Sequence, residues 1–129
     1  PYLRYALAGE DPLPLCARFV RWCFWMAVIK LPGNRYMIAN VQTMLHELNK
    51  VGAVLPHDAV LEPGDIGFLR TRGDSDHGTG MHVFFVDSAG GTTVNSVDGN
   101  WKDSVCHVAR DRWSPTIKAF CRYPVRPMA

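Results

Sequence analysis

The pattern of apolar positions changes along this chain from a helical to a strand-like period. In the first part, apolar residues recur every three or four positions, which predicts two helices. The first is expected to begin at Asp11-Pro12, since aspartate caps a helix and proline suits its first turn. Its apolar side comprises Leu15, Phe19, Trp22, Met26 and Ile29. The second should end at Gly52 and present Met37, Val41, Met44, Leu45, Leu48 and Val51, with His46 and Glu47 on its polar edge.

From Pro63 onward, short apolar runs separated by turn residues predict strands. The expected strands are 66–69, 81–86, 92–97, 104–109 and 117–123. Segment 70–80, which is rich in glycine and polar residues, reads as a loop bordering a cleft. Helices followed by an antiparallel sheet predict an α+β domain.

Composition narrows the organisation and the function. The 129 residues, 47% of them hydrophobic, suit a single domain spanning 1–129, which could have been excised from a longer protein because no initiator methionine or signal peptide is visible. The formal net charge is +2 and the basic residues are scattered, so no nucleic-acid partner is expected. The longest apolar run, Trp22–Ile29, is too short for membrane insertion.

The four cysteines contain no C-x-x-C pair, so neither a disulfide scaffold nor a metal site is expected. Cys106 and Cys121 fall in two late segments that could be neighbouring strands, which leaves one disulfide open if the protein works outside the cytosol. Cys23 lies seven residues after Cys16 on nearly the same helix face, and we predict that it is a small buried hydrophobe.

Cys16 and His82 form a candidate catalytic pair. Cys16 falls in the first turn of the first predicted helix, and His82 heads a predicted strand. A thiolate is the reactive form of cysteine, and both a helix N-terminus and a neighbouring imidazole stabilise it. This order predicts a thiol hydrolase site. His57, His77 and His107 compete with His82, but they lie in loop-like stretches or in a less certain strand.

Either Asp98 or Asn100 could orient the imidazole, as the third member of a triad does. The hairpin loop 88–91 bears on this choice through the register of its strands. A three-residue turn would set His82 directly opposite Asp98, on the same face of the sheet, whereas a turn of two or four residues would set it opposite Val97. The sequence leaves both the turn and the orienting residue open.

Four segments together resemble the NlpC/P60 superfamily, nearest its CHAP branch, over about residues 12–102. They are Leu15–Cys23, Pro63–Phe68, His82–Val86 and Val97–Trp101. The resemblance implies a papain-like α+β fold, in which N-terminal helices pack on an antiparallel sheet. It also implies a peptidoglycan hydrolase that cleaves a peptide or amide bond of the stem or cross-link, and it requires no cofactor.

Carried over by position, the resemblance makes Cys16 the nucleophile, His82 the general base, and Asp98 or Asn100 the orienting residue. The Cys16 backbone N–H would hold the oxyanion. The chain departs from the family at several positions. Met81 and Phe84 replace smaller residues around the histidine, Leu15 replaces an aromatic or polar residue, and Asp98 replaces the Glu common in the CHAP branch.

The resemblance also suggests a cellular setting. An enzyme of this kind would be secreted or delivered to the bacterial periplasm or cell wall, as an antibacterial effector or a lysin. An immunity or inhibitor protein would then be its partner, beside the peptidoglycan substrate. Two other functions stay open: a papain-like thiol hydrolase or transferase acting on proteins, and a non-catalytic module that binds cell wall or protein through a degenerate site.

Overall fold

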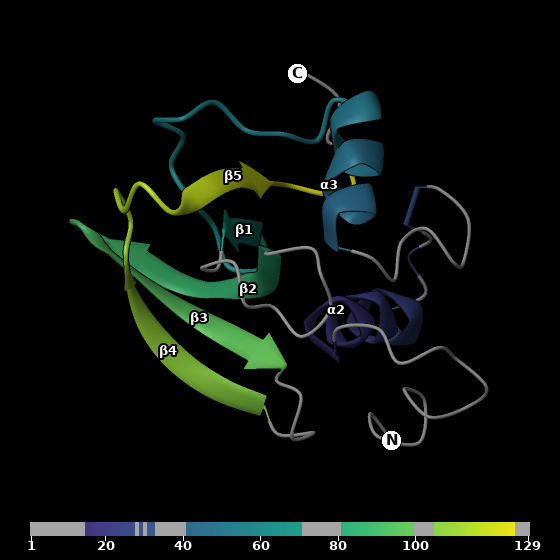
Figure 1. The fold of residues 1–129 in the computed structure, drawn as a ribbon, viewed down its shortest axis with the longest axis horizontal. Helices are drawn as coiled ribbons and strands as arrows, with labels where there is room; N and C mark the ends of the chain where they lie inside the picture. Colours follow the sequence, from purple (N-terminus) through teal and green to yellow (C-terminus); the bar gives the residue numbers. More distant parts are fainter. Residues whose placement is uncertain are drawn as a thin grey trace.

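The protein is described by a computed structural model covering residues 15–27, 29, 31–32, 41–70, 81–99 and 105–125. Within these residues it is an α+β structure with two helices and a five-stranded antiparallel sheet, as the pattern predicts (Figure 1). The helices are α2 (Leu15–Met26) and α3 (Val41–Lys50). The strands are β1 (Ile66–Arg70), β2 (Met81–Gly90), β3 (Thr93–Gly99), β4 (Val105–Asp111) and β5 (Ile117–Cys121), in the spatial order β4-β3-β2-β1-β5.

Both helices pack on one face of the sheet. Buried residues from α2, α3, β1 and β2 form the larger core there: Ala17, Val20, Phe24, Val41, Met44, Leu48, Ile66, Phe68 and Val83. The predicted apolar side of the first helix is partly wrong, because Met26 is 57% exposed and Trp22 is only half-buried. Since α2 is apolar on nearly all sides, its period alone does not identify the packed face.

The opposite face of the sheet is covered by the segment that connects α3 to β1. Leu55 and Leu61 of this segment pack on a second cluster whose buried members are Phe84, Val86, Val94 and Phe120. Because both faces of the central strands are covered, β2 is hydrophobic at successive positions instead of alternating.

Two arginines fasten the connecting segment to the sheet. Arg122 donates to both carboxylate oxygens of the buried Asp65 at 2.8 Å and to the Val60 carbonyl at 2.9 Å. The same carboxylate accepts the backbone N–H of Glu62. The contacts of Arg122 join the region after β5 to the residues just before β1, so this cluster stabilises the fold.

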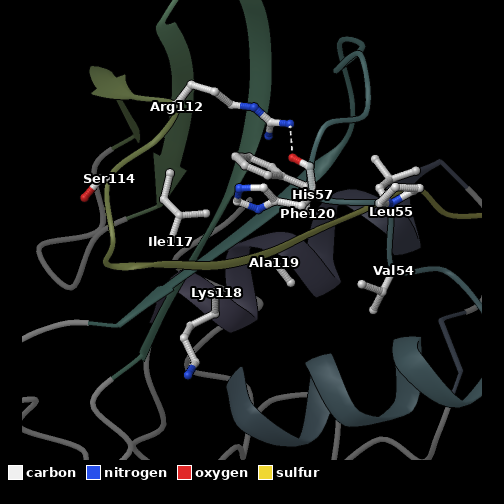
Figure 2. Close-up of a pocket in the computed structure, with 10 residues that line it drawn as sticks. Val54, Leu55, His57, Arg112, Ser114, Ile117, Lys118, Ala119 and Phe120 are labelled. Atoms are coloured by element: carbon white, nitrogen blue, oxygen red, sulfur yellow. Dashed lines mark hydrogen bonds between the residues drawn. The ribbon is translucent and has the colours of Figure 1, made fainter.

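Arg112 makes the second attachment. Its guanidinium donates to the carbonyls of His57 at 2.8 Å and Ala59 at 3.0 Å, and it stacks on the rings of Phe120 and Trp113. A hollow of about 130 Å³ lies between the connecting segment and β5. Figure 2 shows Arg112 among the residues that line it. No residue of α2, β2 or β3 lines the hollow, so it is separate from the region of Cys16.

The structure bears on three further predictions: the end of the second helix, the exposure of Glu47, and the Cys106–Cys121 disulfide. Gly52 has a positive φ of 74° just after α3, the conformation that a helix-terminating glycine adopts. Glu47 was expected at the surface but is buried, with an exposed fraction of 7% and Lys50 as its ion-pair partner. Cys106 and Cys121 lie on β4 and β5, at opposite edges of the sheet with three strands between them, and neither forms a disulfide. The disulfide is therefore excluded.

No helix in the described part of the chain is both long and apolar enough to cross a membrane.

Candidate functional site

Cys16 lies in the first turn of α2 and is 7% exposed. Backbone N–H groups in the first turn of a helix have no partner within the helix, and the aligned peptide dipoles make this end positive. The first turn of α2 contains no acidic side chain to offset that charge. The position therefore suits a sulfur that becomes negatively charged.

His82 is the second residue of β2, and its side chain is 20% exposed. Its Nε2 atom is 2.5 Å from the Asp98 Oδ2 atom at the end of β3. With Nε2 engaged in this way, Nδ1 is the ring nitrogen left for another partner. In Figure 1 the start of β2 and the end of β3 lie on the side of the sheet nearest α2.

Cys16 and Asp98 both act on the charge of the His82 imidazole. Burial lowers the pKa of His82, but hydrogen bonds and charge from Asp98 and from the Cys16 side chain raise it, and the result is a pKa of about 9 instead of 6.5. His82 is therefore an imidazolium at neutral pH. The structure brings Cys16, His82 and Asp98 into one interacting group.

Two residues that the sequence did not suggest hold the Asp98 carboxylate. The Ser96 hydroxyl donates to Oδ1 at 2.5 Å, and the Arg110 Nη2 group donates to Oδ2. Burial raises the pKa of Asp98, but hydrogen bonds from His82 and Ser96 and the charges of His82 and Arg110 outweigh burial and lower it. The carboxylate stays ionised while its side chain is only 4% exposed.

The sequence leaves the register between β2 and β3 open, and the structure matches neither of the two registers considered for His82. The turn consists of the two residues Gly91 and Thr92, not three, and β2 runs on through the expected loop as far as Gly90. Near the site the ladder pairs Phe85 with Val97. Asp98 therefore lies opposite Phe84, the residue before Phe85 in β2, and His82 is its diagonal neighbour on the same face.

A β-bulge produces this shared face. The pairing shifts by one residue between Val86 and Ser88, so that Asp87 is an extra residue in β2. Each one-residue shift exchanges the faces of all later side chains. Without the bulge, the register of the turn would place His82 and Asp98 on opposite faces of the sheet.

Two glycines give the surrounding elements room. A Cβ atom on Gly99, which follows Asp98 in β3, would be 2.3 Å from the Phe19 Cβ atom of α2, so glycine permits the close approach of this helix. A Cβ atom on Gly67 would be 2.2 Å from the Phe84 ring. That ring stacks on His82 with a centroid distance of 6.2 Å. Both glycines therefore leave the space that Phe19 and Phe84 occupy next to the site.

The sequence contains a signal for the two missed residues. Ser96 precedes Asp98 by two positions in β3 and therefore shares its face. Arg110 lies on the half-buried face of β4, where Val108 is the partner of Ser96 in the ladder. An arginine at an inward position of a strand indicates a buried anionic partner.

The remaining candidates are placed as follows. Asn100 and His77 lie outside the described residues, as does the expected loop between β1 and β2. His57 packs beside Trp113 at the hollow in Figure 2, and His107 is exposed on β4. Cys23 is half-buried, and burial raises the pKa of its thiol to about 11. None of the described competitors contacts Asp98.

No protein-family model matches the chain, and no match was found among curated proteins or solved structures. Its chemistry must therefore be inferred from its own residues. In the described part of the chain, no three His, Cys, Asp or Glu side chains are grouped as metal ligands. The site consists of a cysteine side chain, an imidazole that interacts with it, and an ionised carboxylate bound to the imidazole.

Proposed function

We propose that this protein is a thiol hydrolase in which Cys16 is the nucleophile, His82 the acid and base, and Asp98 the orienting residue. One observation carries the proposal: the His82 imidazole binds Asp98 through Nε2 and also interacts with the Cys16 side chain. A positive imidazole stabilises a neighbouring thiolate, and a buried carboxylate behind the ring keeps it positive and fixes its orientation.

The proposed reaction has two halves. The Cys16 thiolate attacks the carbonyl carbon of an amide, and the tetrahedral intermediate collapses as the C–N bond breaks. The His82 imidazolium gives its proton to the leaving amine, which leaves an acyl thioester and a neutral imidazole. Water then gives a proton to His82 and attacks the thioester, which restores the thiolate and releases the carboxylic acid.

The start of α2 supports the negative oxygen of the intermediates. Because Cys16 lies in the first turn, its backbone N–H has no acceptor within the helix. An oxygen bound near the sulfur can accept this hydrogen bond at the positive end of the helix dipole. This support matters more in the transition state than in the ground state, since the charge develops only during the reaction.

The proposed substrate is a peptide or amide bond in the stem or cross-link of bacterial peptidoglycan. This part rests on the resemblance to NlpC/P60 and CHAP domains, whose papain-like fold also has a cysteine helix beside an antiparallel sheet that carries the histidine. The order of α2, β2 and β3 along this chain is compatible with that fold. Action in the bacterial periplasm or cell wall, and restraint by an immunity protein, follow from the same proposal.

Digestion of purified peptidoglycan tests the function. We expect soluble muropeptides whose masses identify the cleaved bond, and we expect Cys16→Ala to reduce their release by roughly a thousandfold or more. Cys23→Ala is the matched control, because it removes another thiol of α2 and should retain activity.

Three outcomes of this experiment contradict the proposal in different ways. Full activity of folded Cys16→Ala excludes the nucleophile. Cleavage of a protein substrate but not of peptidoglycan favours the protein-directed hydrolase or transferase. Binding to the cell wall without cleavage, with a Cys16 that an electrophilic probe does not label at neutral pH, indicates the non-catalytic module.

A further inference from the structure

Arg110 binds the Asp98 carboxylate of the proposed catalytic group. Its Nη2 group donates to Asp98 Oδ2, the same oxygen that binds His82. Its Nε group donates to the Ser96 hydroxyl at 3.1 Å, and that hydroxyl donates to the other carboxylate oxygen. Arg110, Ser96 and Asp98 therefore close a ring of hydrogen bonds in which both carboxylate oxygens are held.

The aromatic ring of Phe84 contacts both the Arg110 guanidinium and the His82 imidazole. The Arg110 guanidinium carbon is 4.7 Å from the Phe84 centroid, and the His82 imidazole stacks on the same ring at 6.2 Å with an interplanar angle of 26°. Gly67 leaves the space that the ring occupies. The arginine and the imidazole thus share one rigid support, and Asp98 bridges them.

We propose that Arg110 is a positioning residue of this site, which holds the Asp98 carboxylate so that Oδ2 stays on His82 Nε2. The inference rests on the proposed function only for its effect on turnover. A guanidinium suits this role better than an ammonium group, since its planar fork contacts the carboxylate and the serine at once. A lysine would supply the charge without the second contact.

A purely electrostatic role makes the opposite prediction. The charged and titratable groups that face His82 among the described residues are Cys16 from α2 and Asp98 from β3, with Arg110 of β4 reaching the same carboxylate. From β1 the partner is the apolar Leu69. If Arg110 only added positive charge, its loss would remove a repulsion and raise the pKa of His82. If it positions Asp98, its loss lets the carboxylate turn away and lowers that pKa.

Titration of His82 by NMR in the intact protein separates the two roles. We expect Arg110→Met, which keeps an apolar stem over Phe84, to lower the pKa of His82 by about one unit or more. Arg110→Lys should fall between this variant and the native protein. Lys118→Met on β5 is the matched control, because it removes an exposed positive charge at the opposite edge of the sheet and should leave His82 unchanged.

Turnover gives a second readout of the same variants. Arg110→Met should lower kcat by about tenfold or more with little change in KM, since the arginine lies behind the acid and base and not on the substrate. Because the titration uses no substrate, a native protein without hydrolytic activity would contradict the proposed function alone. The pKa of His82 would still decide the role of Arg110.

A folded Arg110→Met variant in which His82 titrates near pH 9 or higher overturns the inference. If that variant does not fold, Ser96→Ala takes its place, because it removes the hydroxyl that links Arg110 to Asp98 while the arginine remains. It should shift the His82 pKa downward by less than Arg110→Met would. An unchanged His82 pKa in both Ser96→Ala and Arg110→Lys also overturns the inference.

Discussion

Two buried aspartates, Asp98 and Asp65, pair with arginines in this molecule and serve different ends. Asp98 is bound by Arg110 and Asp65 by Arg122, and both carboxylates are almost fully buried. Asp98 also binds the His82 imidazole, whereas the further partner of Asp65 is a backbone N–H group before β1. The first cluster contains an imidazole whose pKa is raised to about 9, and the second only joins segments of the fold.

Each aspartate also lies near a cysteine, and the comparison shows what an imidazole changes. Burial and the negative charge of Asp65 raise the pKa of the Cys121 thiol to about 12, so this sulfur stays protonated. At the other cluster His82 stands between Asp98 and Cys16 and is positively charged at neutral pH. A carboxylate alone opposes a thiolate, but the same carboxylate behind an imidazole favours one.

Alkylation rates give the largest test of this contrast. We expect iodoacetamide at pH 7 to modify Cys16 at least about a hundredfold faster than Cys121, because only a thiolate reacts. Mass spectrometry of tryptic peptides at timed intervals measures both rates. In urea the two cysteines should react alike, which controls for peptide recovery. Equal rates in the folded protein would contradict the proposed role of His82.

Matched substitutions of the two aspartates should have different effects: one lowers hydrolysis, and the other lowers the free energy of unfolding. Asp98→Asn should lower hydrolysis by roughly a hundredfold or more, because the amide no longer holds an imidazolium. Asp65→Asn should lower the free energy of unfolding by about 2 kcal/mol, since it removes the charge from the carboxylate that accepts both hydrogen bonds of Arg122. Its hydrolysis per folded molecule should be unchanged.

Urea denaturation and substrate cleavage measure the two quantities. Asp98→Asn should also slow the alkylation of Cys16, and Asp65→Asn should not. Loss of hydrolysis in folded Asp65→Asn, or full hydrolysis in Asp98→Asn, would show that the two clusters do not differ in the way their contacts indicate.

The same two clusters show how much the sequence predicts. Cys16 at a helix start and His82 at a strand start follow from local patterns, and the antiparallel α+β arrangement is confirmed. The sequence leaves the residue opposite His82 open between Asp98 and Val97, and the structure places neither directly opposite it, because the register depends on the length of a turn and on a bulge at Asp87. Both are set by contacts along the whole hairpin, so counting residues cannot give them.

Local sequence patterns do not predict which arginines bind the two aspartates. Arg110 reaches Asp98 only because β4 pairs with β3, and Arg122 reaches Asp65 only because β5 pairs with β1. The second pairing joins strands that lie far apart in the chain, so it also explains why Cys106 and Cys121 are not neighbours. Strand order depends on how the faces of the sheet are covered, which a period along one strand does not report.

The Asp98 cluster, but not the Asp65 cluster, should make stability depend on pH through His82. A raised pKa means that folding favours the charged form of His82, so this contribution is complete below pH 6.5 and is lost as the pH rises through about 9. This contribution of His82 to the free energy of unfolding is about 3 kcal/mol. Urea denaturation at pH 6.5 and pH 9.5 should show this loss in the native protein and in Asp65→Asn. Because the raised thiol pKa values of Cys23 and Cys121 also lower stability above pH 9, His82→Gln should still lose some stability, but about 3 kcal/mol less than the native protein. An equal loss in the two proteins would assign the titration to another group.

The smallest expected effect concerns the fit of α2 against the first cluster. Gly99→Ala places a Cβ atom 2.3 Å from the Phe19 Cβ atom, so the helix must move. Overpacking of this kind costs about 1–3 kcal/mol. Gly90→Ala is the control, because a Cβ atom there meets nothing within 4 Å and should change stability by less than about 0.5 kcal/mol.

Cys16 and Phe19 belong to the same helix, α2. When Phe19 moves away from residue 99, the Cys16 sulfur therefore also moves away from His82. We therefore expect Gly99→Ala to slow the alkylation of Cys16 and to leave that of Cys121 unchanged, in folded protein at pH 7. Equal slowing at both cysteines would mean that the substitution loosens the whole core. An unchanged rate at Cys16 would mean that the contact of Gly99 with Phe19 does not set the distance between the thiol and the imidazole.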